Sequence, residues 1–312
     1  MLGDPMPWLL DLSRPNLHWR VLTDLIHRPP ESPAVARARG GADAVDPIAT
    51  LIEDLMPDGS WACDAALWQR FSGPGWRLLA AVQWGADPTD PRLHAASLRL
   101  LEEAPGGGPF AEREGEVAAP WLTARVLQGL ARLGWCRHSR FQEALAWLDE
   151  AAPRSADGGW LGSAADSEST ACGVTPVALL DCLNVCGGAN RAGLRERAVH
   201  AVCSAAAAAG EKFFLLGHPN FDRTDAAEAL FVLSRAGAGL DPEIVAALSR
   251  LQGLQGEGGR WARAVEVPES LPVGRRPETG EPSQWITLEA AAAVLHYAVE
   301  AGLPRRFPQK PS

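Results

Sequence analysis

The stretch Leu-Gln-Gly-Leu-Gln-Gly-Glu-Gly-Gly-Arg-Trp at residues 251–261 decides the fold, because it ends a helical segment with a glycine-rich turn and then an aromatic residue. Shorter versions of this ending occur at 57–61, 106–110 and 157–160. The aromatic residues of the four copies, Trp61, Phe110, Trp160 and Trp261, follow one another at intervals of 49, 50 and 101 residues. A period of roughly 50 residues predicts a repeat architecture with one supersecondary unit per repeat.

Each repeat holds two helices of different character. The segment 121–133 is apolar nearly all round, which is typical of a helix buried on every side. The next segment is amphipathic, with Phe141, Leu145 and Leu148 on one face. Buried helices are expected to begin near Asn16, Pro74, Ala119, Cys172, Asp222 and Gln284, with amphipathic partners at about 34–55, 90–104, 139–152, 193–208 and 241–253. Because almost nothing alternates with period two, the sequence predicts an all-α protein.

Six helix pairs can stack as an open solenoid or close into a ring. Solenoids end in polar capping repeats, whereas the repeat ends of this chain carry tryptophan and glycine-rich turns. We therefore expect a closed α/α toroid of inner and outer helices, with residues 1–312 forming a single domain. The segment 266–282 has no helical or strand period and is long for a connection, so we expect it to cover one mouth of the toroid.

Composition excludes several classes of protein. The 312 residues include 29 basic and 38 acidic side chains, a net charge of -9 that argues against binding nucleic acid. No apolar run reaches the roughly 18 residues of a membrane-spanning helix, so no stable membrane insertion is expected. The first residues lack the features of a signal peptide, which predicts a cytoplasmic protein. The six cysteines are interpreted as small buried residues and not as a disulfide framework.

The repeat resembles that of the terpene cyclase and prenyltransferase superfamily, whose members share an α/α toroid and a recurring motif with a Gln and a Gly-x-Trp ending. The stretch 251–261 matches this motif well, and the stretches 144–160 and 51–61 match it without the Gln. The chain looks most like small, single-toroid bacterial relatives, which end with a segment similar to 281–288. This resemblance implies an apolar, isoprenoid or polyene-like substrate held inside the toroid.

The resemblance also suggests where an acid catalyst would lie. Squalene–hopene-type cyclases protonate an alkene with the middle Asp of an Asp-x-Asp-Asp motif at the start of an inner helix. The nearest match is Asp222-Arg223-Thr224-Asp225, which has Thr224 at the acid position. We therefore expect Asp225, aided by Asp222 or His218, to be the proton donor, with Glu168 as a second candidate. The alternative interpretation is that these acids cap helices and stabilise their first turns.

Aromatic residues at the starts of the inner helices are candidates for a substrate-binding wall. Their faces would shield a developing cation, each contributing about 0.5–2 kcal/mol. The alternative for each of them is core packing. Arg275, in the mouth loop, is the candidate that would pair with an acid or an anionic substrate group. The complete set of substrate-binding candidates is Trp19, Trp68, Trp76, Trp121, Phe221, Trp285 and Arg275.

Metal and cofactor chemistry is not expected. Asp181, Cys182 and a histidine supply the ligand types of zinc-dependent prenyltransferases, but adjacent side chains on a helix point about 100° apart and would not readily share one ion. There is no Asp-Asp-x-x-Asp cluster for magnesium, no glycine-rich phosphate loop followed by Lys, and no dinucleotide fingerprint.

Two functions follow from these observations. The leading hypothesis is a terpene-cyclase-like enzyme that performs an acid-assisted cyclisation or isomerisation without a cofactor. The rival is a non-catalytic toroid that binds a lipid, a peptide or a partner protein, and it rests on Thr224 at the acid position. A closed apolar cavity with one or two buried carboxylates would favour the enzyme, whereas a flat or wholly polar mouth would favour the binding protein.

Overall fold

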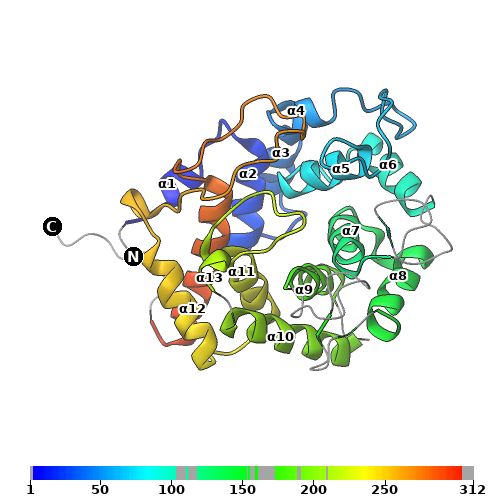
Figure 1. Cartoon of the computed structure of the whole chain (residues 1–312). Coiled ribbons are helices and arrows are strands. Elements are labelled where there is room, and N and C mark those ends of the chain that lie inside the picture. Colours follow the sequence, from blue (N-terminus) through cyan, green and yellow to red (C-terminus); the bar gives the residue numbers. More distant parts are fainter. Residues whose placement is uncertain are drawn as a thin grey trace.

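The computed structural model describes residues 3–102, 110–111, 118–152, 154, 159–160, 173–187, 191–208 and 210–303. These ranges form helices joined by turns and loops, and their only β-type pairings are isolated bridges (Figure 1). The expected all-α class is therefore confirmed for the described part of the chain.

Six helical segments carry the most buried side chains. The expected starts agree with the observed ones to within a few residues, because each start follows a proline, a glycine or a capping side chain. In α9, ten consecutive residues from Val174 to Leu183 are buried, as expected for a helix that other helices surround. The six segments are α2 (Pro15–Arg20) with the π-helical turn Val21–Leu25, α5 (Pro74–Gln83), α7 (Pro120–Arg132), α9 (Val174–Cys186), α11 (Ala226–Ala236) and α13 (Gln284–Glu300).

The remaining helices are amphipathic or short. In α12 (Pro242–Gly253), Ile244, Leu248 and Leu251 are buried on one face. The helix expected over 34–55 is broken into α3 (Pro33–Arg39), a 3-10 turn and α4 (Ile48–Leu51), because Gly40-Gly41 and Pro47 interrupt it. The others are α1 (Met6–Leu9), α6 (Pro91–Glu102), α8 (Ser139–Glu150) and α10 (Ala192–Ala207).

The repeated glycine-rich turn forms the same local structure in three described copies. The indole N–H groups of Trp61, Trp160 and Trp261 donate to the carbonyl oxygens of Leu51, Leu148 and Leu251 at 3.3, 2.9 and 2.7 Å. Each tryptophan also forms an isolated antiparallel bridge across its turn. Each copy of the repeat thus satisfies a carbonyl at the end of the preceding helix and packs an indole against that end.

The most buried helices are neighbours in chain order. α7 packs on α9, α9 on α11, and α11 on α13, while α5 packs on α7 and the Val21–Leu25 turn packs on α13. α2 reaches the end of α5, where Asn16 Nδ2 donates to the carbonyl of Trp84 at 3.0 Å and Trp19 Nε1 to that of Gly85 at 2.7 Å. Helices α8, α10 and α12 lie outside α7, α9 and α11 (Figure 1).

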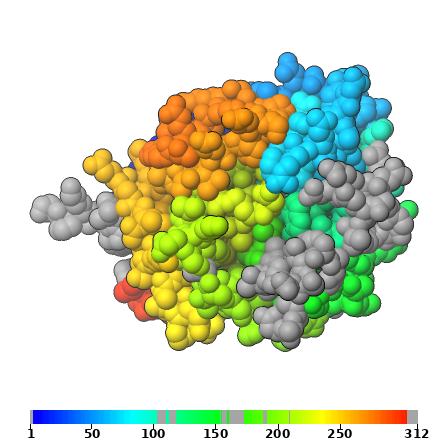
Figure 2. All heavy atoms as spheres, in the orientation of Figure 1, coloured from blue at the N-terminus to red at the C-terminus, as the bar shows by residue number. Residues whose placement is uncertain are grey.

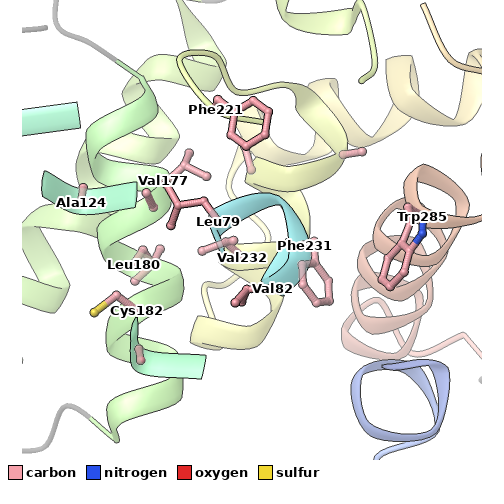
Figure 3. Close-up of a cluster of buried hydrophobic side chains, with 14 of the residues drawn as sticks. Leu79, Val82, Ala124, Val177, Leu180, Cys182, Phe221, Phe231, Val232 and Trp285 are labelled. Atoms are coloured by element: carbon pink, nitrogen blue, oxygen red, sulfur yellow. The ribbon is translucent and has the colours of Figure 1, made fainter. Parts of the chain in front are cut away.

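Apolar side chains fill much of the space between these helices. Leu79 from α5, Ala124 from α7, Val177 from α9 and Val232 from α11 converge in one cluster (Figure 3). Close packing of such side chains leaves little free volume between these helices.

One cysteine interpretation was wrong. Cys136 and Cys186 form a disulfide that joins the turn after α7 to the end of α9, across a sequence separation of 50 residues. Cys63, Cys182 and Cys203 are free thiols. The pair was missed because neither residue belongs to a recognisable spacing pattern, and only the packing of α7 against α9 brings the two together.

No helix within the described ranges is long and apolar enough to cross a membrane.

Candidate functional site

Asp225, the expected proton donor, caps α11. Its Oδ1 accepts hydrogen bonds from the backbone N–H groups of Ala227 and Glu228 at 3.0 and 3.1 Å. Its Oδ2 accepts the N–H of Gly217 at 2.8 Å. The side chain is fully buried, so these backbone donors would have no partner without it. The alternative interpretation of Asp225 as a helix cap therefore describes its geometry.

The groups around the Asp225 carboxylate are those that a hydrogen-bond acceptor requires. Burial raises the pKa of this carboxyl above its usual value and the charge of Glu228 adds to the rise, while the Arg223 guanidinium, 3.7 Å away, and the backbone hydrogen bonds oppose it. Asn220 Nδ2 also donates to Oδ2, at 3.4 Å. Every described group that contacts the carboxylate oxygens at hydrogen-bonding distance is a donor, so a proton on this carboxyl would point at another donor. The geometry of Asp225 is that of an acceptor and not of a general acid.

The other predicted acids are not gathered around Asp225. Asp222 lies at the surface and pairs with Arg70. Thr224, at the position where the resemblance places the acid, donates its hydroxyl to Glu228 Oε2 at 2.9 Å. Glu168 lies outside the described residues.

His218 stacks on Trp285, which belongs to α13. Its ring is parallel to the indole of Trp285, with the centroids 5.1 Å apart, and its Nδ1 lies 3.9 Å from Glu289 Oε1. Burial lowers the pKa of His218 well below its usual value, and it raises the pKa of Glu289 well above its own. The positive charge of Arg263 adds to the first shift, and the negative charge of Glu228 adds to the second. Both shifts favour the uncharged forms, a neutral imidazole and a protonated carboxyl.

Glu289 was missed by the sequence analysis. The signal was present, because Glu289 is an acid within the otherwise apolar segment 288–295. Acids in a helix that is apolar all round have to be paired or protonated.

Ion pairs between the most buried helices were also missed. Arg125, from α7, is 1% exposed and forms a bidentate pair with Glu228, from α11. Its Nε and Nη2 donate to the carbonyl oxygens of Phe221 and Arg223 at 3.0 and 2.6 Å. This single side chain thus ties α7 to the loop that precedes α11.

A second group of ion pairs lies further along the same helices. Arg132 pairs with Asp181 at 2.6 Å and Arg20 with Asp24 at 2.6 Å, while Arg235 lies 3.8 Å from both acids. Burial alone would raise the pKa of Asp181, but the charges of Arg132 and Arg235 outweigh it and lower the pKa below its usual range. These ion pairs therefore join α7, α9 and α11 to the segment 15–25.

The space left among these charges is small. The cavity there has a volume of about 30 Å³ and is lined by Asp181, His218, Trp285 and Glu289, among others. Within the described part of the chain, Asp181 Oδ1, His218 Nε2 and Glu289 Oε2 have no hydrogen-bond partner. A polar cavity of this size holds about one water molecule, which would satisfy such atoms.

Four of the predicted aromatic residues form one cluster near the starts of α5 and α7. Trp76 stacks on Trp121 with ring centroids 6.0 Å apart, and meets Trp68 and Phe221 edge-on, each at 5.4 Å. Trp76 is 1% exposed, so it is a core residue. Trp19 is not part of this cluster. Its indole N–H donates to the carbonyl of Gly85, at the end of α5.

Trp285 also lines a much larger cleft, with a volume of about 580 Å³. Its walls come from α1, the start of α2, the turn at Asp46–Pro47, the end of α5, and the segments 260–263 and 275–285. Trp8 and Trp84 add two further aromatic residues. Helices α1 and α2 and the orange 266–282 segment, which form part of the cleft wall, lie together in Figure 1.

The 266–282 loop, which forms part of this cleft, is tied down along its length. Arg276 donates to the carbonyl oxygens of Pro268, Glu269 and Leu271 at 2.5–2.6 Å. Asp46 accepts the backbone N–H groups of Gly274 and Arg275 at 3.2 and 3.0 Å. These contacts make the loop a fixed wall of the cleft.

The loop also meets the segment before α5. Ser270 Oγ donates to the carbonyl of Arg70 at 3.1 Å, and the space-filling view shows the orange loop beside the blue 60–72 segment on one face (Figure 2). Arg275, the predicted anion-binding residue, lines the cleft but pairs with Glu281 at 3.2 Å.

Within the described ranges, no three His, Cys, Asp or Glu side chains gather as a metal site would require. Comparison of the chain with protein-family models, with curated proteins and with solved structures finds no match.

Proposed function

We propose that the chain is an α/α toroid of six helix pairs, related to the terpene cyclase and prenyltransferase superfamily. Two observations support this proposal. The most buried helices are neighbours in chain order, and α2 returns to the end of α5 through the hydrogen bonds of Asn16 and Trp19. The repeated tryptophan turn also makes the same indole-to-carbonyl bond in three copies.

We further propose that the protein is a ligand-binding toroid that holds a small molecule in the cleft beside Trp285, and not along the axis between the inner helices. The contrast in volume carries this proposal: about 580 Å³ for the cleft against about 30 Å³ for the cavity among the buried charges. Pockets for small organic ligands have volumes of about 300–1,000 Å³ and combine aromatic side chains with a few polar groups. The cleft meets both conditions.

An acid-assisted isomerase or cyclase is the second candidate, and one observation favours it. Glu289 is a partly buried acid beside the Trp285–His218 stack, and desolvation raises its pKa well above the usual value, which favours the protonated form that a general acid needs. The cavity next to Glu289 has room for about one water molecule, so an isoprenoid could reach the Glu289 carboxyl only if Trp285 moved. Loss of turnover in Glu289→Gln on an identified polyene substrate would support this candidate.

Filling the cleft tests the binding proposal. Val45 lines the cleft and is half-buried, so Val45→Trp places an indole in it. Leu12→Trp is the matched control, because Leu12 is close by but is 76% exposed and is not among the lining residues. A library of small fragments is screened by thermal shift, and small molecules that co-purify are identified by native mass spectrometry. We expect ligands of the wild type to be retained by Leu12→Trp and lost from Val45→Trp. Equal binding by the two variants would contradict the proposal.

A further inference from the structure

Arg263 is a buried positive charge without a carboxylate partner. It is 3% exposed, and its Nη1 donates only to the carbonyl oxygens of His218 and Val265, at 2.5 and 3.3 Å. Its Nε has no partner, and within the described part of the chain no acid lies within ion-pair distance of it. Burial lowers the pKa of Arg263 to about 10, so the guanidinium remains charged at neutral pH. Buried charges in proteins are normally paired, so this one lacks a counter-ion.

Arg263 lines the cleft of about 580 Å³ together with two other arginines that form no ion pair among the described residues. Arg260 lies over the ring of Trp8, 4.4 Å from its centroid, and Arg14 is exposed. Guanidinium groups bind carboxylates and phosphates through paired N–H donors, and cation–π contact leaves the edge of the guanidinium free to do so.

The acids that line the cleft are already engaged. Asp46 accepts the backbone N–H groups of Gly274 and Arg275, and Glu281 pairs with the side chain of Arg275. Asp11 accepts the backbone N–H of Ser13, and this hydrogen bond lowers the pKa of the Asp11 carboxyl. Asp225 and Glu281 act on Arg263 only from beyond ion-pair distance, and the cleft lining holds four arginines against three acids, so its net charge is positive.

We infer that the ligand of the cleft is an organic anion of the carboxylate or phosphate-monoester class. Its charged group binds Arg263, with Arg260 as a second cation, and its apolar body lies against the tryptophans of the cleft. This inference rests on the proposed function, since it specifies the ligand of the same site. It also assigns the anion to Arg263 and not to the predicted Arg275, whose guanidinium has its own carboxylate in Glu281.

The test compares probes that share a phenyl ring and differ in charge. Phenyl phosphate, benzoate and neutral benzyl alcohol are titrated into the whole protein labelled with ¹⁵N, and the assigned indole N–H signals of Trp8 and Trp285 are followed. Phenyl phosphate and benzoate should bind at least about tenfold more tightly than benzyl alcohol, the factor expected for a charge-assisted hydrogen bond. Arg263→Met should remove this preference and leave benzyl alcohol within about twofold of the wild type.

Two further variants keep the test decisive. Arg263→Lys retains the charge and should retain the preference for anions even if Arg263→Met folds poorly. Arg275→Gln removes a rim charge that is already paired, and it should change affinity less than about twofold. If benzyl alcohol binds the wild type as tightly as phenyl phosphate, or if Arg263→Met keeps the preference, the anion inference is wrong while the binding function stands. If no probe shifts either indole signal, both proposals fail.

Discussion

Replacing Asp225 with Asn tests whether the Asp225 carboxyl accepts hydrogen bonds or donates a proton. Asn has the shape of a protonated Asp, so it would fit well if Asp225 carried a proton in the folded protein. In the observed geometry, one oxygen holds the N–H groups of Ala227 and Glu228, and the other holds that of Gly217 at 2.8 Å. The Asn amide can keep only one acceptor, and its NH₂ group then faces a donor.

The cost of Asp225→Asn can be worked from these contacts. A buried N–H of Gly217 left without a partner costs about 1–3 kcal/mol. Loss of the negative charge at the start of α11 costs about 0.3–1 kcal/mol more. The two add up to a loss of about 1.3–4 kcal/mol in the free energy of unfolding, with most of it at Gly217.

The assay is urea unfolding at pH 7, followed by circular dichroism, with the slope against denaturant checked for constancy. Asp222→Asn is the control, since Asp222 starts the same segment but is exposed and paired only with Arg70, and it should cost less than about 1 kcal/mol. If Asp225→Asn is as stable as Asp222→Asn, the carboxyl is not an acceptor and the reasoning is refuted.

Three further predictions concern stability and the loop. Burial raises the pKa of Glu289 above its usual 4.5, so ionising Glu289 destabilises the folded protein. As the pH rises above 4.5, the wild type should lose stability relative to Glu289→Gln by up to about 1.4 kcal/mol per pH unit, until the folded-state pKa is passed. The measurement is the unfolding free energy of both proteins from about pH 4.5 to 8. The double change Cys136→Ser and Cys186→Ser should lower the unfolding free energy by about 4 kcal/mol, because the disulfide closes a loop of 50 residues; a change below 1 kcal/mol would contradict this. Arg276→Met should speed amide hydrogen exchange in the 266–282 loop at least about tenfold and leave α9 unchanged, whereas equal exchange would show that the loop is held in another way.

The helices could be predicted from the sequence because their signals are local. Prolines, glycines and caps set the starts, and the apolar period separates α9 from α12. The tryptophan turn was recognisable because Trp61, Trp160 and Trp261 recur at regular spacing. The helix expected over 34–55 failed at Gly40-Gly41 and Pro47, which a stricter treatment of helix breakers would have detected.

The candidate site was predicted less well, because it depends on contacts between distant residues. The pairs Arg125–Glu228 and Arg132–Asp181 join residues 103 and 49 positions apart, and no spacing rule connects them. The expected proton donor is a helix cap, and Arg275 is already paired. Arg263 went unnoticed since nothing in its neighbouring sequence shows that the side chain is buried. Charged residues within apolar helices were the one signal that could have been used.

The central claim is that small molecules bind in the cleft beside Trp285 and not between the most buried helices. A crystallographic fragment screen tests this most directly, with several hundred compounds of mixed charge soaked into crystals of the whole protein. We predict that bound fragments cluster in the cleft, that their carboxylate or phosphate groups contact Arg263, and that only water occupies the cavity at Asp181, His218 and Glu289. Apolar fragments bound among those three residues, with the cleft empty, would contradict the claim.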